Sequence, residues 1–168
     1  MINTLRIAGT VEDSIVDGEG IRFTIFCQGC ARRCPGCQNP ETQPMTGGHA
    51  VTFDNLLKAI DKNPLLTGVT YSGGEPFEQA EALAALSPHI HEKGLNIWCY
   101  TGYTMEEIAS GADKKKKALL AVVDVLVDGA YIEEERDLTL HFRGSRNQRI
   151  IDLKATHKKK DIVLLYED

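Results

Sequence analysis

The chain lacks any long apolar run: none of its 168 residues falls in a stretch near the roughly 20 apolar residues that a membrane-spanning helix needs. Its first six residues also lack the apolar core of a secretory signal. Positive charge is scarce, with 19 Lys and Arg against 24 Asp and Glu, and nucleic-acid phosphates are bound mainly by accumulated cations. The basic runs 114–117 and 158–160 are interpreted as solvated surface. We therefore expect neither a membrane nor a nucleic-acid partner.

Cysteine is also rare, and its distribution is uneven. Only five cysteines are present, and four of them lie within residues 27–37. Clustered cysteines in a chain without a secretory signal indicate a metal site rather than disulfides, so we expect a cytoplasmic protein. The cluster follows the apolar run 21–26, which is typical of a buried β-strand. A strand that delivers thiols into a loop is suited to holding a metal.

Two sets of ligands remain open. If Cys27, Cys30, Cys34 and Cys37 all bind, the site is closed, as for structural zinc or an electron-carrying iron–sulfur cluster. If only the last three bind, in the spacing C-x3-C-x2-C, a 4Fe-4S cluster keeps one iron without a protein ligand, and that iron can bind a substrate. The short spacing favours this second set. In zinc sites built from two pairs of cysteines, the two pairs are usually separated by about a dozen or more residues. Cys27 continues the strand alternation and is then a buried apolar side chain.

Short apolar runs alternate with amphipathic segments along the rest of the chain. Strands are predicted at 5–8, 21–26, 68–71, 96–100, 125–127 and within 162–166, and helices at 53–60 after the cap Thr52, at 79–93 and from about 104. An apolar segment near 119–122 is left unassigned. This alternation predicts parallel βαβ units. Four to six strands are too few for a closed barrel of about 250 residues. The expected fold class is α/β, a partial, open β/α barrel with a mostly parallel sheet. A single domain is expected over residues 1–168, with a strand and loop in 1–20 and a tail with an edge strand in 153–168.

Several loops with unusual composition follow predicted strands. These are residues 27–37, which we call the cysteine loop, and the segments Ser72–Pro76, Thr101–Tyr103 and Asp128–Gly129. The carboxyl ends of parallel strands share one edge of a sheet, so we expect these loops to lie together. Gly73 and Gly74 lack side chains that would block a ligand, and with Glu75 they are interpreted as binding a cationic amino group near the cluster. A glycine pair after a strand is otherwise a simple turn.

On these residues the chain resembles a known family. The cysteine spacing and Ser72–Pro76 resemble the radical S-adenosylmethionine enzymes, in particular the small activating enzymes of glycyl-radical proteins. Over residues 17–148 the resemblance extends to the subgroup that acts on anaerobic ribonucleoside-triphosphate reductase. The segments that carry it are Asp17–Arg22, Cys34–Cys37, Tyr100–Tyr103, Val127–Gly129 and Arg143–Gln148.

The resemblance implies a mechanism. Cys30, Cys34 and Cys37 would hold one 4Fe-4S cluster, and S-adenosylmethionine would bind its fourth iron. An electron from a low-potential donor such as flavodoxin would release methionine and a 5′-deoxyadenosyl radical, which would take hydrogen from a glycine of the reductase. The residues placed around S-adenosylmethionine by the same resemblance are Gly36, Cys37, Gln38, Ser72, Gly73, Gly74 and Glu75. No side chain is expected to be catalytic, because the chemistry belongs to the cluster and the cofactor.

Five further candidate residues have weaker support. Tyr100 and Asp128 are either neighbours of the cofactor's ribose or sulfonium, or ordinary strand-end side chains. Arg143, with Arg146 and Gln148, either binds a carboxylate of the cofactor or partner, or belongs to a surface loop.

One departure from the family pattern concerns the residue before the third cysteine. Many radical S-adenosylmethionine enzymes have an aromatic residue there, and this chain has Gly36. The pair Pro35-Gly36 is usual in the reductase-activating subgroup, but stacking on adenine from this position is not expected.

Two other functions stay open from the sequence. One is a radical enzyme of similar size that rearranges a small molecule, such as a pterin-derived precursor in deazapurine synthesis. The other is a zinc-stabilised binding module that uses all four clustered cysteines.

Overall fold

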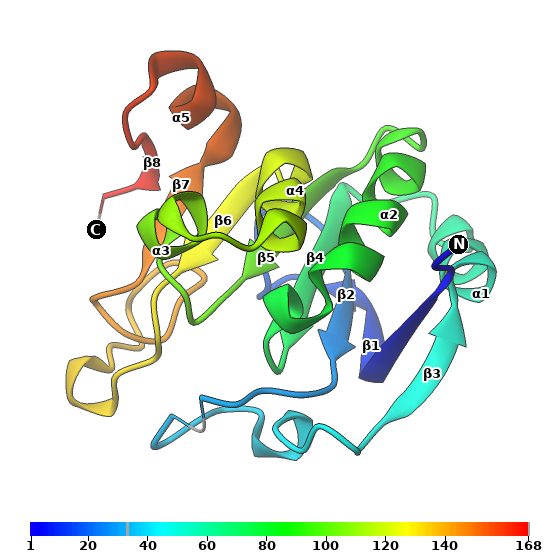
Figure 1. Cartoon of the computed structure of the whole chain (residues 1–168), viewed down its shortest axis with the longest axis horizontal. Coiled ribbons are helices and arrows are strands. Elements are labelled where there is room, and N and C mark those ends of the chain that lie inside the picture. The colour runs from blue at the N-terminus through cyan, green and yellow to red at the C-terminus, as the bar shows by residue number, and fades with distance from the viewer. Residues whose placement is uncertain (33, 168) are drawn as a thin grey trace.

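The computed structural model describes residues 1–32 and 34–167, and these residues form one open sheet with helices packed on it (Figure 1). The strands are β1 (Thr4–Ser14), β2 (Arg22–Cys27), β3 (His49–Thr52), β4 (Gly68–Gly73), β5 (Asn96–Tyr100), β6 (Val125–Asp128), β7 (Arg149–Asp152) and β8 (Leu164–Tyr166). Their order across the sheet is β3-β1-β2-β4-β5-β6-β7-β8. The sheet therefore ends at β3 and β8 and does not close.

The four central strands, β2, β4, β5 and β6, pair in parallel. On one side β1 pairs antiparallel with both β2 and β3, and on the other side β7 pairs antiparallel with both β6 and β8. Only β1 and β7 therefore run against the other strands of the described residues. The prediction of an open α/β sheet with strands mostly in one direction is confirmed.

The predicted number of four to six strands is wrong, because the described residues contain eight. The two strands that were not predicted are β3 and β7, each four residues long. Three of the four β3 residues are exposed, so the segment has no buried apolar face, and its strand conformation comes from pairing with β1. β7 is followed directly by a helix, which leaves no turn signal between the two elements.

The helices are α1 (Phe53–Asp61), α2 (Ala80–His91), α3 (Met105–Ser110), α4 (Lys114–Val122) and α5 (Leu153–Lys159), with short 3-10 turns η1 (Pro40–Thr42), η2 (Pro76–Gln79) and η3 (Glu133–Glu135). The predicted cap of α1 is confirmed, since Thr52 Oγ1 accepts a hydrogen bond of 3.1 Å from the N–H of Asn55. The tail contains the expected edge strand β8, but it also contains α5, which was not predicted.

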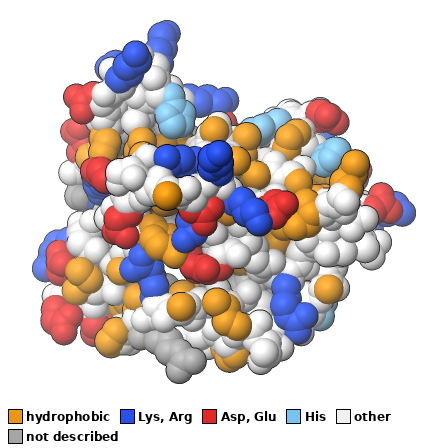
Figure 2. Space-filling model, in the orientation of Figure 1, with side chains coloured by type: hydrophobic (Ala, Val, Ile, Leu, Met, Phe, Trp, Pro, Cys, Tyr) orange, Lys and Arg blue, Asp and Glu red, His pale blue; other side chains and the backbone are white. Residues whose placement is uncertain are grey.

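The helices cover one face of the sheet (Figure 1). The surface on this side carries side chains of both charges (Figure 2). Lys114–Lys117 form the first turns of α4, and Lys115 pairs with Glu81 of α2 at 2.9 Å. This agrees with the interpretation of that basic run as solvated surface. No helix in the described ranges has both the length and the apolar composition needed to span a bilayer.

Alternate residues of the central strands face opposite sides of the sheet. Phe23, Ile25 and Cys27 of β2 belong to the main core, together with apolar residues of α1, α2 and α4. Trp98 and Val127, on the other side, belong to a second, smaller cluster. The sheet therefore has a helix-covered face and a second face with its own packing.

Arg22 is fully buried and is anchored on this second face. Its guanidinium donates to Thr70 Oγ1 at 2.7 Å and to Asn96 Oδ1 at 2.7 Å, and lies 5.5 Å from the centre of the Trp98 ring. Burial lowers the pKa of Arg22 to about 10. The Arg of the segment Asp17–Arg22 thus ties three parallel strands together, which is a structural role.

Candidate functional site

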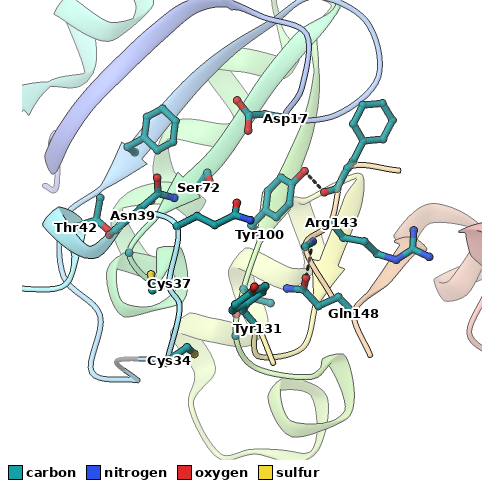
Figure 3. Close-up of a pocket in the computed structure, with 18 of the residues that line it drawn as sticks. Asp17, Cys34, Cys37, Asn39, Thr42, Ser72, Tyr100, Tyr131, Arg143 and Gln148 are labelled. Atoms are coloured by element: carbon teal, nitrogen blue, oxygen red, sulfur yellow. Dashed lines mark hydrogen bonds between the residues drawn. The ribbon is translucent and has the colours of Figure 1, made fainter. Parts of the chain in front are cut away.

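The carboxyl ends of the central strands open onto one cavity of about 900 Å³ (Figure 3). Its wall includes residues from the loops after β2, β4, β5 and β6, such as Cys30, Gly74, Thr101 and Gly129. The expectation that these loops lie together is confirmed. The parallel sheet brings them to one edge although they are far apart along the chain.

Three cysteines lie on the cavity wall and one does not. Cys30, Cys34 and Cys37 are half-buried and line the cavity. Cys27, the last residue of β2, has no exposed surface and packs in the main core beneath the helices. Burial raises the pKa of the Cys27 thiol, which disfavours the thiolate form that binds metals. The predicted burial of Cys27 is confirmed.

The donor set fits a multi-iron cluster. Three thiols sit on one loop and one cavity wall, and none of the five cysteines, all of which are described, forms a disulfide. The described residues bring no three His, Cys, Asp or Glu side chains together around a single-ion position. In a 4Fe-4S cluster each cysteine thiolate binds a different iron, and three thiols on one cavity wall are a suitable ligand set for it.

Main-chain hydrogen bonds fix the start of the cysteine loop. The N–H of Gly29 donates to the carbonyl of Thr42 at 2.7 Å, and the N–H of Cys30 donates to the carbonyl of Gln43 at 3.0 Å. The segment that returns from the loop through η1 therefore runs beside the segment that enters it. This holds Cys30 at the cavity wall.

A tight turn brings the last two cysteines together. The N–H of Cys37 donates to the carbonyl of Cys34 at 3.1 Å, and Gly36 has a φ of +76°. Proline at the second position and a positive φ at the third are the features of a type II turn. A Cβ at Gly36 would also overlap the Glu133 carboxylate. The Glu133 side chain is exposed and can move aside, so the positive φ of the turn accounts for the glycine at this position, and Gly36 itself does not line the cavity.

The glycine pair after β4 supports the cysteine loop. The N–H of Gly74 donates to the carbonyl of Cys27 at 2.8 Å, and the N–H of Glu75 donates to the carbonyl of Gly29 at 2.8 Å. A Cβ at Gly74 would lie 2.8 Å from the carbonyl oxygen of Thr42 and closer still to that of Gly29. The expected close approach of backbone is present, but its partner is the cysteine loop, and these two N–H groups are engaged within the protein.

Glu75 crosses the cavity wall to the next loop. Its side chain is buried and accepts hydrogen bonds from Thr101 Oγ1 at 2.8 Å, from the N–H of Gly102 at 2.7 Å and from the N–H of Phe77 at 3.0 Å. Burial raises the pKa of Glu75, and the three donors oppose that rise. Glu75 therefore fixes the loop after β5 relative to the loop after β4, and Ser72 and Gly73 line the cavity beside it.

Tyr100 and Gln148 also line the cavity, and both hold the segment that follows β6. Tyr100 donates through its hydroxyl to the carbonyl of Phe142 at 2.5 Å, and burial raises its pKa. Gln148 donates to the carbonyl of Gly129 at 3.0 Å and accepts from the N–H of Gly144 at 3.0 Å (Figure 3). Their side chains shape the far wall by these contacts.

The two arginines of the last predicted segment do not form a fork toward the cavity. Arg143 lines the cavity, but its guanidinium extends away from Cys34 and Cys37 (Figure 3). Arg146 is exposed and does not line the cavity. The interpretation of this pair as a carboxylate-binding site in the cavity has no support from their placement.

Asp128 lies outside the cavity wall. Its carboxylate is almost fully buried and accepts from the Arg149 guanidinium at 2.5 and 3.0 Å and from the N–H of Met105 at 2.8 Å. Asp128 therefore joins the end of β6 to β7 and to the start of α3. This placement favours the alternative of a strand-end structural side chain.

Asp128→Asn is expected to lower stability without affecting cofactor binding. The substitution removes the buried one of the two carboxylates that pair with Arg149 and leaves the exposed Glu106, at 2.6 Å, as its charged partner, which costs about 1–3 kcal/mol. We expect a fall in Tm of several degrees, read by thermal unfolding, and an unchanged Kd for S-adenosylmethionine in the reconstituted protein. A weakened Kd with an unchanged Tm would contradict this assignment.

Several residues that line the cavity were not predicted as site residues from the sequence. They include Asp17, Asn39, Thr42 and Tyr131 (Figure 3). Asp17 accepts from Ser14 Oγ at 2.5 Å and from Thr24 Oγ1 at 3.1 Å, and so faces the cavity from the second face of the sheet. Its membership of the segment Asp17–Arg22 was the one available signal.

Comparison with known proteins assigns the chain to a family. Residues 16–151 match the model of the 4Fe-4S single cluster domain. The anaerobic ribonucleoside-triphosphate reductase-activating protein of Vibrio cholerae is 38% identical over 144 residues, which cover 81% of this chain and 90% of that protein. The proteins of the same name from Escherichia coli K12 and phage T4 are 30% and 31% identical, covering 83% and 80% of this chain and 94% and 86% of those proteins.

A solved structure shares the fold. The crystal structure of QueE from Escherichia coli superimposes with a TM-score of 0.50 at 20% sequence identity, over 60% of this chain and 53% of that one. At this identity the likeness concerns the fold alone.

The cysteine loop, the cavity and these matches define the class: the chain is a radical S-adenosylmethionine enzyme built around a 4Fe-4S cluster. Within this class it belongs to the family of anaerobic ribonucleoside-triphosphate reductase-activating proteins.

Proposed function

We propose that this chain generates a glycyl radical on an anaerobic ribonucleoside-triphosphate reductase. Its open sheet is then a partial β/α barrel, with the working cavity at the carboxyl ends of the parallel strands. The observation that carries the proposal is the different location of the clustered cysteines. Cys30, Cys34 and Cys37 lie on the cavity wall, whereas Cys27 lies in the core. These three thiols would hold a 4Fe-4S cluster and would leave one of its irons for S-adenosylmethionine.

When bound, the cluster and S-adenosylmethionine supply the one-electron cleavage of a carbon–sulfur bond, and the chain supplies binding and orientation. We assign the methionine end of the cofactor to the wall of Ser72–Glu75 and the nucleoside end to the side of Gln38. Gly36 acts on the cofactor only indirectly, by setting the turn that places Cys37. Tyr100 and Gln148 contribute by holding the segment after β6 as the far wall.

The remaining parts of the proposal concern the surroundings. The clustered thiols call for a reducing compartment, so we place the protein in the cytoplasm. A low-potential donor such as flavodoxin is the proposed source of the electron. The acting partner is the reductase that the relatives are named for.

The test mixes anaerobically reconstituted protein, a chemical reductant, S-adenosylmethionine and the reductase. We expect a glycyl-radical doublet in the electron paramagnetic resonance spectrum of the reductase, together with 5′-deoxyadenosine. Omission of the reductase should leave only slow, uncoupled cofactor cleavage. Efficient turnover of a small molecule, with no radical on the reductase, would reject the proposal in favour of a small-molecule enzyme.

A further inference from the structure

Five apolar side chains line one part of the cavity, four of them exposed and one, Leu140, half-buried. Val11, Ile15 and Val16 line it from the region where β1 ends, and Leu138 and Leu140 line it from the segment after η3. We call these five residues the apolar lip. Leu138 is 80% exposed, and Ile15 and Val16 are each 70% exposed.

The exposure of the lip is enforced by the local structure. Ser14 donates through Oγ to Asp17 at 2.5 Å, and the carbonyl of Asp17 accepts from Thr70 Oγ1 at 2.7 Å. Both ends of this bend are therefore anchored, and Ile15 and Val16 at its tip are held in solvent. On the other side the N–H of Asp137 donates to the carbonyl of Gly144 at 3.1 Å, and the Asp137 carboxylate accepts from the N–H of Thr139 at 2.9 Å, so Leu138 lies in a local turn that is held at Asp137.

Exposed apolar side chains gathered at one opening usually mark a binding surface. Residues 11–16 and 138–140 are far apart in the sequence, yet both border the same cavity that holds the three cysteines. Asp17, next to Val16, lies across the cavity from Cys34 and Cys37 in Figure 3. The part of the lip next to Asp17 therefore lies across the cavity from these two cysteines.

We propose that the apolar lip binds the glycine-bearing segment of the reductase, by contact with apolar side chains that flank the reacting glycine. This proposal rests on the proposed function. A backbone glycine can reach the cavity floor only as part of an extended segment that crosses the mouth. The five lip side chains carry no charge, so the contact that they offer to the segment is apolar.

The test compares the double variant Ile15→Ser/Leu138→Ser with the control Leu65→Ser. Leu65 is 72% exposed and does not line the cavity, so the control removes similar exposed apolar surface elsewhere. Because all three side chains are exposed, these variants should fold. Three measurements are made: the Kd of the full chain for the reductase by biolayer interferometry, glycyl-radical formation as a function of reductase concentration, and 5′-deoxyadenosine formation without reductase.

We expect the double variant to raise both the Kd and the KM for the reductase about tenfold or more, with 5′-deoxyadenosine formation in the absence of reductase within about twofold of wild type. The control should match wild type in all three. Unchanged Kd and KM in the double variant would overturn the proposal. Equal loss of reductase-free cofactor cleavage would also overturn it, by assigning the lip to the cofactor.

Two further outcomes distinguish reductase binding from self-association and from failure of the proposed function. Loss of a wild-type dimer in gel filtration, without a change in reductase affinity, would assign the lip to a second copy of this chain and overturn the proposal. If the wild-type chain forms no glycyl radical at all, the proposed function fails and the lip proposal fails with it. If wild type is active and the double variant equals it, only the lip proposal fails.

Discussion

Replacement of Cys34 by alanine should abolish both iron binding and radical formation, whereas Cys27→Ala should preserve them. Cys34 lines the cavity on the turn that also places Cys37, and its thiol is half-buried. Without it the cluster keeps two protein thiolates, and the loss of one ligand removes most of the affinity. Activity should fall by at least a thousandfold, to background. The same result is expected for Cys30→Ala and Cys37→Ala.

Cys27→Ala tests the opposite assignment in the same loop. Its thiol has no exposed surface and packs in the main core, so the substitution removes one buried sulfur and costs about 1 kcal/mol of stability. Cys99→Ala is the matched control, because Cys99 is equally buried and lies on β5, away from the loop.

The measurement is iron and sulfide per chain after anaerobic reconstitution, with the absorbance of the brown cluster. Wild type, Cys27→Ala and Cys99→Ala should each bind about four irons per chain, and the three wall variants should not. A protein that instead holds one zinc and loses it on replacement of any of the four clustered cysteines would identify a closed structural site and refute the open cluster.

The cysteine loop is the part of the site that could best be predicted from the sequence. Strand periodicity over 21–26 put Cys27 on the buried side, and the spacing of the next three cysteines put them in the loop. The structure places Cys27 in the core and the other three on the cavity wall. Both predictions succeeded because they depend on local alternation and on residues adjacent in the chain.

The contacts across the cavity could not be predicted in this way. Glu75 was interpreted as a ligand for a cationic group, yet its carboxylate is occupied by donors from Thr101, Gly102 and Phe77. The first two of these donors lie more than 25 residues away and become neighbours only because β4 and β5 pair in parallel. No sequence pattern states which loop a buried carboxylate will face.

Edge strands show the same limit in the fold. β5 was predicted with its observed bounds, Asn96–Tyr100, because it is an apolar run between polar turns. β3 has an exposed surface and no such run, and its conformation follows from its hydrogen bonds to Thr4–Ile7 of β1. Elements whose conformation comes from a partner strand leave little trace in their own residues.

Gly74→Ala should disable the protein without touching any cysteine. The new Cβ would lie between the carbonyl oxygens of Gly29 and Thr42, within 2.8 Å of the latter, and both are backbone atoms of the cysteine loop and its returning segment. Backbone on both sides cannot move aside as a flexible side chain can. Overpacking of this kind costs about 1–3 kcal/mol, and it pushes the loop away from β4.

The functional loss should exceed the loss of stability. Displacement of a reacting group by about 1 Å can lower a rate roughly a hundredfold, and the hydrogen bonds from Gly74 to Cys27 and from Glu75 to Gly29 would both lengthen. We therefore expect glycyl-radical formation at least a hundredfold below wild type, with a Tm lower by several degrees and a cluster that is incompletely loaded or rapidly lost. Iron content, unfolding temperature and radical yield are measured on the same preparation.

Gly9→Ala is the matched control for this substitution. Gly9 lies in β1 with nothing within 4 Å of a Cβ built on it, and its φ is outside the left-handed region. A glycine replaced by alanine at such a site restricts mainly the unfolded chain, so stability should stay constant or rise by a few tenths of a kcal/mol. If Gly74→Ala behaved like Gly9→Ala in cluster content and radical yield, the close packing of β4 against the cysteine loop would not be what positions the three thiols.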